Sequence, residues 1–542
     1  MKIAKFFTFT AMALLGLLPH IHAQIPPTEP LPMTNSAQVA GKVPASEFPE
    51  LAPTTAGPFQ PDMESFKQYR CPDWFRDAKF GIWSHWGPQA VPGADGWYAR
   101  NMYIEGSRTY KSHLAKYGHP SKFGYKDIIP LWKAEKFDPD ALMALYKKAG
   151  ARYFVSMGVH HDNFDLWDSS KIHKWNAVNM GPKKDVVALW QAAAKKQGLR
   201  FGLSEHLGYS FTYLQTSHGA DKEGALAGVP YDGDDPAFKN LYLWKADPET
   251  DPDPVSKGMG WTRDKLFHAL WFERIKDLID RHQPDLLYCD ARSLKFDETG
   301  MRLLAHYYNS NIRKNGGTLD AVYNLKCDRP GWVFDMERGL QTSIRSEPWQ
   351  TCTSNGDWFY NPSHWRKYKK PGQVIQTLCD IVSKNGNLLL NVVQYPDGSL
   401  PPESQKLLDE LAAWMPINGE AIFETRPWKT FGEGPASEQS MVKSELFNED
   451  ELRFTTEDIR FTQAKDGKTL YAIALGAPTG PVRIKSLGAG SKLMEKKIAA
   501  VSLLASNAKL DWKQETDALV IQPPAQWPCQ HAVAFKIAMG NQ

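Results

Sequence analysis

Residues 71–103 read CPDWFRDAKFGIWSHWGPQAVPGADGWYARNMY, and within them a short β-run, Phe80–Trp83, leads to the histidine His85 between two tryptophans. Similar apolar runs recur down the chain, and each finishes beside a His, Asp, Glu, Asn or Trp residue. Enzymes built on a barrel of parallel strands place their site at the carboxyl ends of those strands. The pattern therefore predicts a barrel enzyme, and a histidine among tryptophans suits a sugar as its ligand.

Eight β-candidates rich in branched and aromatic residues lie between Lys79 and Val393, several of them separated by helical patterns. They are Phe80–Trp83, Tyr153–Met157, Phe201–Ser204, Leu286–Cys289, Ala321–Leu325, Trp332–Met336, Trp349–Thr353 and Leu388–Val392. Amphipathic helices are predicted over Pro139–Ala149 after the cap Asp138, over Val186–Lys196, and around Leu270, Trp271, Ile275 and Leu278. This alternation predicts a (β/α)8 barrel, which is irregular because no helical pattern follows the fifth and sixth strands.

The amino terminus has the pattern of a signal peptide. Lys2 and Lys5 precede the apolar stretch Phe6–Pro19, and the small residue Ala23 follows it. The apolar stretch is too short for a membrane span of about 20 residues, and no comparable run appears later. We therefore expect residues 1–23 to be a cleaved leader, no membrane span in the mature chain, and a periplasmic or secreted location.

Three further parts follow the leader. Residues 24–61 are rich in Pro, Ala, Thr and Ser without periodicity, which predicts an extended arm. The barrel is expected over residues 62–428. After Trp428 the pattern changes to short alternating runs, which predict an antiparallel β-sandwich over residues 429–542.

Composition narrows the class of ligand. The 542 residues carry a net charge of +3 with mixed signs, which gives no electrostatic basis for binding nucleic acid. Aromatic residues make up 12% of the chain, with 19 Trp, and their rings can stack on sugar C–H faces or fill the core. The six cysteines are scattered, so neither a zinc knuckle nor a disulfide framework is indicated, although one or two bridges remain open. The oligomeric state is not predicted.

Carboxylates at the strand ends indicate glycosidic bond cleavage. Cleavage with retention needs one ionised carboxylate to attack the anomeric carbon and a second, protonated one to protonate the leaving oxygen. Asp290 ends the apolar strand that begins at Leu286, which suits the nucleophile, and Glu337 ends the strand two further on. Asp335, Glu205 and Glu347 are rivals of Glu337 as acid and base.

The run His160-His161-Asp162 raises the alternative of a metal site. Adjacent residues of a strand point to opposite faces, so both histidines could bind one ion only through a bulge or loop. We therefore expect no metal, and interpret His85, His161 and His206 as hydrogen-bond partners of ring hydroxyls.

Several motifs, taken together, resemble the α-L-fucosidases of glycoside hydrolase family 29. The similarity covers roughly residues 73–428. The motifs are WFRDAKFGIWSHWGP (74–88), GVHHDNF (158–164), PDLLYCD (284–290), PWQTC (348–352) with Trp358 and Tyr360, VSKNGNLLLN (382–391) and WMPINGEAIFETRPW (414–428).

The resemblance implies a retaining exo-enzyme that releases L-fucose from fucosylated oligosaccharides or glycoconjugates, without metal or organic cofactor. By motif position Asp290 matches the family nucleophile, and Glu337 is the best match for the acid/base. Residues matching the fucose pocket are His85, Trp97, His160 and His161. Further candidate substrate-binding residues are Glu205, His206, Lys326 and Trp349.

The chain also departs from the family pattern. Gly96-Trp97 replaces a Glu-Trp pair, Ser204-Glu205-His206 replaces a Tyr-Tyr-Ser pattern, and Lys326 stands where the family has an arginine. A lysine presents a point charge and cannot bind in the bidentate manner of arginine. The sugar therefore stays open between L-fucose and a relative such as L-galactose, and a non-catalytic glycan-binding protein is a third alternative.

A long acidic, Pro-rich insertion, Thr216–Arg263, follows the third strand. If the barrel prediction is right, this insertion lies on the active face, and we expect it to shape the sites for sugars beyond fucose. A calcium loop and a disordered surface loop are the competing interpretations.

Overall fold

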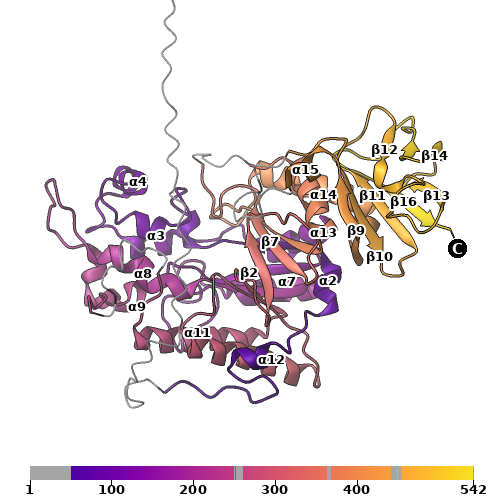
Figure 1. The fold of residues 1–542 in the computed structure, drawn as a ribbon. Coiled ribbons are helices and arrows are strands. Elements are labelled where there is room, and N and C mark those ends of the chain that lie inside the picture. Colours follow the sequence, from indigo (N-terminus) through magenta and orange to yellow (C-terminus); the bar gives the residue numbers. More distant parts are fainter. Residues whose placement is uncertain are drawn as a thin grey trace, which may run out of the picture. The chain divides into compact units, whose positions relative to one another are not determined.

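Eight parallel strands close into a barrel in the computed structural model of the chain (Figure 1). The structure describes residues 50–249, 251, 260–362, 368–440, 449 and 453–540. The barrel strands are β1 Phe80–Ser84, β2 Tyr153–Val159, β3 Arg200–Glu205, β4 Leu286–Cys289, β5 Val322–Leu325, β6 Val333–Glu337, β7 Trp349–Ser354 and β8 Gly386–Asn391. Each overlaps a strand predicted from the sequence, and the closed parallel order confirms the predicted barrel.

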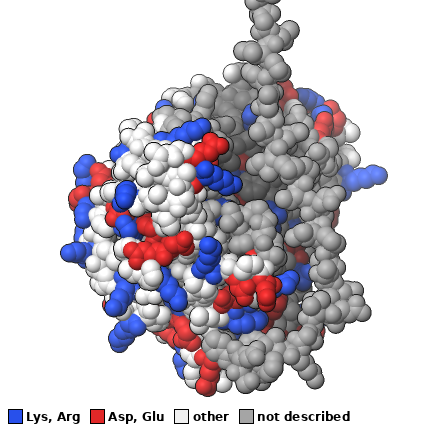
Figure 2. Space-filling view, turned by 90° about the vertical axis from the view of Figure 1, so that its left-hand side faces the viewer, with Lys and Arg blue, Asp and Glu red and all other residues white. Residues whose placement is uncertain are grey.

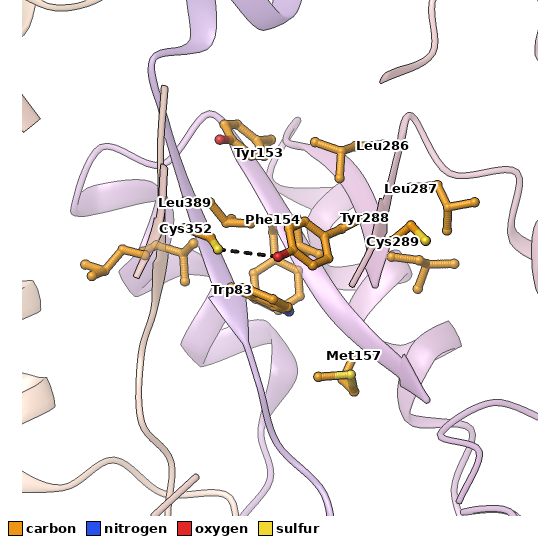
Figure 3. Close-up of a cluster of buried hydrophobic side chains, with 14 of the residues drawn as sticks. Trp83, Tyr153, Phe154, Met157, Leu286, Leu287, Tyr288, Cys289, Cys352 and Leu389 are labelled. Atoms are coloured by element: carbon orange, nitrogen blue, oxygen red, sulfur yellow. Dashed lines mark hydrogen bonds between the residues drawn. The ribbon is translucent and has the colours of Figure 1, made fainter. Parts of the chain in front are cut away.

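Side chains fill the inside of the barrel (Figure 3). Trp83 Nε1 donates to Ser204 Oγ at 3.1 Å, and the Tyr153 hydroxyl donates to Gln350 Oε1 at 2.9 Å. The Tyr288 hydroxyl lies 3.4 Å from Cys352 Sγ, the contact drawn as a dashed line. Because rings bonded across the strands occupy the interior, a ligand has room only at an end of the barrel.

Helices lie on the outside of the barrel. The long ones are α6 Pro139–Lys148, α7 Val186–Lys196, α11 Lys265–His282, α12 Glu298–Lys314, α13 Pro371–Ser383 and α14 Pro402–Asn418. Asp138, Asp185 and Asp264 cap α6, α7 and α11, each accepting a backbone N–H three residues on. The connections after β5 and β6, residues 326–332 and 338–348, are fully described and contain no helix, as predicted. Among the described residues, no helix is both long and apolar enough to span a membrane.

Short helices fill the connections after β1 and β3. They are α3 Tyr98–Asn101, α4 Arg108–Tyr117, α5 Tyr125–Ile128, α8 Ser210–Leu214 and α9 Lys239–Tyr242, while α1 Met63–Phe66 and α2 Asp73–Ala78 precede the barrel. On the face shown in Figure 2, acidic and basic side chains are interspersed and do not gather by sign.

The described part of the acidic insertion, residues 216–249, is folded, and its best-buried carboxylates bind hydroxyl groups. Asp232 accepts from Tyr103 at 2.7 Å and from Tyr242 at 2.6 Å. Asp221 accepts from Tyr110 and Tyr231. The contacts with Tyr103 and Tyr110 fix the insertion to the β1–β2 connection.

The end of the predicted arm runs along α11 and α12. The backbone N–H of Ala52 donates to Glu273 at 2.7 Å, and that of Phe59 donates to Asn309 at 3.0 Å. Residues 50–61 are therefore bound to the barrel. The predicted signal peptide, residues 1–23, lies outside the described residues.

Two antiparallel sheets form the carboxyl-terminal part. One has the order β13-β16-β11-β10-β9 and the other β12-β15-β14, which confirms the predicted sandwich. The strands are β9 Thr425–Glu433, β10 Ile459–Ala464, β11 Thr469–Ala474, β12 Val482–Ile484, β13 Ile498–Leu503, β14 Trp512–Gln514, β15 Leu519–Ile521 and β16 Val533–Met539, with α15 Pro435–Ser440 after β9. The first strand thus begins three residues before the predicted limit of the barrel at Trp428.

Buried polar contacts join the sandwich to the barrel. Arg460 of β10 donates from Nε to Asp380 of α13 at 2.6 Å, and Trp414 of α14 donates to the carbonyl of Ala532 at 2.8 Å. All six cysteines lie among the described residues, and none forms a disulfide.

Candidate active site

Polar residues from six neighbouring strands meet at the carboxyl end of the barrel. Each stands at or just past the end of its strand, so the closed barrel places residues far apart in sequence around one opening. They are His85 after β1, His160 and His161 after β2, His206 after β3, Asp290 after β4, Lys326 after β5 and Glu337 at the end of β6.

Asp290 is the centre of this group. Its Oδ2 lies 3.1 Å from His206 Nδ1 and 3.4 Å from His161 Nε2. Its Oδ1 accepts a hydrogen bond from Lys326 Nζ. A single buried carboxylate is therefore surrounded by three nitrogen-bearing side chains.

These neighbours determine the charge of Asp290. Burial by itself would raise the pKa of this carboxyl, but Lys326, His206 and the contact with His161 outweigh burial and hold the pKa well below its usual range. Asp290 is thus ionised at neutral pH, which is the state that a nucleophilic carboxylate needs.

Lys326 connects Asp290 to Glu337. Its Nζ also donates to Glu337 Oε2 at 2.6 Å. Burial would lower the pKa of this lysine, yet the two carboxylates raise the pKa well above its usual range, so the ammonium stays charged. One cation therefore lies between the two carboxylates that the sequence proposes for catalysis.

Two of the rival carboxyls lie away from this opening. Asp335 is fully buried in the barrel interior, where Gln350 Nε2 donates to it at 2.8 Å, and burial raises its pKa to about 6. Glu347 is exposed and precedes β7, at the amino end of that strand. Neither has a described contact with the Asp290 group.

The structure does not bring Glu205 into the site. Lys295 Nζ donates to its carboxylate at 2.8 Å and Trp271 Nε1 donates at 3.2 Å. Side chains alternate along a strand, and because Ser204 faces the interior, Glu205 faces the helices outside. The expectation that Glu205 contacts substrate is therefore corrected to a role in packing α11 against β3.

Trp349 is also placed away from the site. It is the first residue of β7, pairs with Gly386 at the start of β8, and donates from its indole to the carbonyl of Lys384 at 2.9 Å. Because the strands are parallel, the start of β7 lies at the end of the barrel opposite Asp290, so the position of Trp349 excludes contact with a sugar there.

The two adjacent histidines both face the opening, the arrangement that the sequence allowed only through a bulge or loop. Strand β2 ends at Val159, so His160 and His161 lie in the following turn, where the alternation of a strand no longer applies. Their ring centroids are 4.4 Å apart. His160 packs against His85, and His161 lies against Asp290.

Three histidines of the opening, His85, His160 and His206, are buried and have lowered pKa values. Burial lowers the pKa of His206 to about 4, and burial with the neighbouring histidines lowers the pKa of His85 and His160 well below the usual range. Within the described structure neither ring nitrogen of His85 has a hydrogen-bond partner. These nitrogens are available to a ligand that brings hydroxyl groups into the opening.

Two residues of the opening carried no sequence signal for their roles. Gln89 donates from Nε2 to His160 Nδ1 at 2.6 Å and accepts from the Tyr213 hydroxyl at 2.9 Å, so it fixes which nitrogen of His160 carries the proton. The Phe359 ring lies 4.9 Å from the His85 ring. Gln89 lies in a single 3-10 turn, Pro88–Ala90, and Phe359 in a loop, and neither segment is long enough for periodicity to mark the direction of a side chain.

Aromatic side chains line the rest of the opening. The Trp358 ring lies 5.2 Å from His85 and 5.5 Å from Trp83. Trp97, predicted to contact the sugar, is 36% exposed, and its ring lies 6.3 Å from His161. These rings offer apolar faces beside the ionised Asp290, a combination that suits a sugar with one apolar side.

Two sets of side chains bring their ligand atoms close enough to hold a metal ion. One is His85, His160 and His206, and the other is His161, His206 and Asp290, with the ligand atoms of each set within 4.8 Å of one another.

Comparison with known proteins identifies the family. The model of the family described as α-L-fucosidase matches residues 48–420, and the model described as the α-L-fucosidase carboxyl-terminal domain matches residues 453–538. Together they span the barrel and the sandwich.

Similar proteins and structures agree with this assignment. The mouse tissue α-L-fucosidase is 27% identical over 497 residues, which cover 89% of this chain and 95% of the mouse protein. The human tissue α-L-fucosidase is 25% identical over 493 residues, covering 88% and 91%. The crystal structure of Thermotoga maritima α-fucosidase in complex with fucose has a TM-score of 0.67 and 25% identity, covering 89% of this chain and 100% of that one. The chain therefore belongs to the α-L-fucosidase family of glycoside hydrolases.

Proposed function

We propose that the protein is an exo-acting α-L-fucosidase that works with retention by double displacement. Asp290 attacks the anomeric carbon of a terminal L-fucose and forms a glycosyl-enzyme bond while Glu337 gives its proton to the leaving glycosidic oxygen. Glu337 then takes a proton from water, which attacks the same carbon and releases fucose.

The shared contact with Lys326 is the observation that carries this proposal. Asp290 and Glu337 each accept a hydrogen bond from the same ammonium nitrogen. Because both bonds end on one nitrogen, the two bound oxygens lie no more than about 5.5 Å apart, which is compatible with a retaining pair at about 5–5.5 Å and too close for an inverting pair at about 6.5–9.5 Å. The spacing supports a direct attack by Asp290.

The surrounding groups support recognition of a sugar ring. The free nitrogens of His85 accept from or donate to ring hydroxyls, and His160 donates from Nε2 because Gln89 donates to its Nδ1. Trp358 and Trp97 pack on the apolar face of the ring. Glu337 exchanges its contact with Lys326 for the leaving oxygen when the substrate enters.

Substitution of the nucleophile tests the proposal. Asp290→Ala should lower the hydrolysis of an aryl α-L-fucoside by at least about 10³-fold, and azide should restore part of the rate by replacing the carboxylate. Glu347→Ala is the matched control, because this carboxylate is exposed at the other end of β7. Unchanged activity in Asp290→Ala would remove Asp290 from the mechanism.

A panel of aryl glycosides tests the sugar. We expect cleavage of the α-L-fucoside at a higher kcat/KM than the α-L-galactoside, whose extra hydroxyl an apolar wall rejects only moderately, by about 10²-fold or less. Preference for the galactoside would change the substrate and leave the mechanism in place.

We also propose that the protein is exported, on the leader pattern of residues 1–23. Expression of the full chain followed by fractionation and amino-terminal sequencing should give a mature protein that begins near Gln24. Recovery of the uncleaved chain from the cytoplasm would contradict export.

A further inference from the structure

Three atoms that could bind a metal ion, one each from Asp290, His206 and His161, lie close together in the opening. Asp290 Oδ2 lies 3.1 Å from His206 Nδ1 and 3.4 Å from His161 Nε2, and all three atoms are mutually within 4.8 Å. All three side chains are at least nine-tenths buried, with relative exposures of 6%, 3% and 2%.

These separations are those of atoms bound to one small metal ion. Tetrahedral zinc has bonds of about 2.0–2.1 Å to nitrogen and oxygen, which places neighbouring ligand atoms about 3.3 Å apart. Both measured separations from Asp290 Oδ2 are within a few tenths of an ångström of this value. The two histidine nitrogens lie within 4.8 Å of each other, so an ion could bind with a shift of at most about 1.5 Å between them.

The three ligand atoms mainly contact one another. His161 Nδ1 donates to the carbonyl of His206 at 2.8 Å, which holds the ring in the manner of a metal-binding histidine. His161 Nε2 and His206 Nδ1 both face Asp290 Oδ2, at 3.4 Å and 3.1 Å, and a bound ion would replace these two contacts. Lys326 binds the other carboxylate oxygen, Oδ1.

We propose that His161 Nε2, His206 Nδ1 and Asp290 Oδ2 form a binding site for one divalent transition-metal ion of the zinc type. Two imidazoles and one carboxylate are a ligand set that such ions prefer. No metal is needed for hydrolysis as proposed above, so the ion acts at this site as a reversible inhibitor.

Inhibition follows because the ion binds the carboxylate that must attack the sugar. This consequence rests on the proposed role of Asp290 as nucleophile, whereas metal binding itself does not. Zinc and sugar should exclude each other, since both need the same opening.

Calorimetry tests the site without any measurement of activity. Chelator-treated protein titrated with zinc chloride should bind one ion per chain, and cobalt(II) should give the visible absorption of a low-coordinate site. His161→Gln should weaken binding by at least about 10-fold. His85→Gln should leave the affinity unchanged, because His85 lies in the other set of histidines.

The controls separate the alternatives. Asp290→Ala is a second ligand variant if His161→Gln does not fold, and His268→Gln removes a buried histidine that belongs to neither set of ligand atoms. Absence of stoichiometric binding to the wild-type protein would overturn the site. Loss of binding in His85→Gln with retention in His161→Gln would overturn the assignment of its ligands.

Kinetics then test the inhibitory consequence. Zinc should inhibit hydrolysis of the aryl α-L-fucoside competitively, and a chelator should restore the rate. If calorimetry shows the site occupied while hydrolysis is unchanged, inhibition is overturned and Asp290 is not the nucleophile. If calorimetry shows no binding, the metal site fails and the proposed hydrolysis stands.

Discussion

Two buried clusters of lysine and carboxylate in this chain are built in opposite ways. In the mouth cluster, Asp290, Lys326 and Glu337, one cation lies between two carboxylates. In the interdomain cluster, Asp380, Lys384 and Arg460, one carboxylate lies between two cations. The interdomain side chains are all 0% exposed, whereas those of the mouth cluster are 9–16% exposed.

The difference lies in the balance of charge and in the neighbours of each cluster. Both oxygens of Asp380 accept strong hydrogen bonds, from Arg460 at 2.6 Å and from Lys384 at 2.8 Å, and the contacts join the sandwich to the barrel. The mouth cluster has two carboxyl groups on one cation and lies beside histidine nitrogens that have no hydrogen-bond partner among the described residues. A closed ion cluster of this kind stabilises a fold, while an open one at the end of a barrel is arranged to meet a ligand.

Substitution of Glu337 tests the mouth cluster and should have the largest effect. Glu337→Ala should lower kcat/KM by about 10²–10⁴-fold on substrates with poor leaving groups, because these need a proton on the departing oxygen. Aryl fucosides with good leaving groups should lose far less. Steady-state kinetics over a series of substituted phenols measures the difference.

Glu347→Ala is the control for this series and should follow the wild-type protein throughout. An equal loss in Glu337→Ala on good and poor leaving groups would move the acid role to another residue. The contrast between a functional mouth cluster and a structural interdomain cluster would then no longer hold.

Substitution of Asp380 tests the interdomain cluster. Asp380→Ala leaves two buried cations without their carboxylate, so we expect the free energy of unfolding to fall by about 3–5 kcal/mol. The activity of the molecules that remain folded should not change, since Asp380 lies on α13 outside the barrel. Urea unfolding and activity per folded molecule give the two values.

Asp77→Ala is the matched control at the same interface. Asp77 also pairs with two cations of the sandwich, Arg426 and Lys465, but these pairs are partly exposed. Their loss should cost no more than about 1 kcal/mol. A loss in Asp77→Ala as large as that in Asp380→Ala would show that burial does not distinguish the two interfaces.

The mouth cluster could be predicted from the sequence because each of its residues stands at or just past the end of a strand that is recognisable on its own. Apolar runs identified all eight strands, and the residue after each run gave His85, Asp290 and Glu337. A parallel barrel then brings these strand ends together whatever their separation in sequence. The positions of the strand ends therefore predict most of the residues of the site.

Side-chain direction at a strand end was harder to predict. Glu205 is the last residue of β3, and a one-residue difference in where the strand ends decides whether it faces the opening or the helices. Its partner Lys295 lies 90 residues away in sequence. Trp349 was misplaced for a related reason, since it begins its strand and so lies at the other end of the barrel.

The closed cluster gave no sequence signal. Asp380 and Arg460 are 80 residues apart and belong to different domains. A charged residue in an amphipathic helix such as α13 normally faces water. Only the docking of the sandwich on that helix turns Asp380 into a buried group, and a pattern within one segment does not report the packing of two domains.

The smallest expected effect is the alkaline pH dependence of stability. It distinguishes the two clusters because the pKa values of their lysines are shifted in opposite directions. Burial lowers the pKa of Lys384 to about 8 despite Asp380, whereas the two carboxylates raise the pKa of Lys326 above its usual range. Between about pH 8 and 10.5 the unfolded chain therefore holds more protons on Lys384 than the folded chain, so this lysine makes the free energy of unfolding rise with pH, by less than about 1.4 kcal/mol per unit. The shift of Lys326 has the opposite sign, so its contribution to the free energy of unfolding is present below about pH 10.5 and is lost only above it.

Urea unfolding of wild type, Lys384→Met and Lys326→Met from pH 7 to 10.5 should show that Lys384→Met alone removes an upward slope in this window. Equal slopes in wild type and Lys384→Met would mean that the lysine of the closed cluster stays charged, and the two clusters would then differ in geometry but not in the cost of burying their cations.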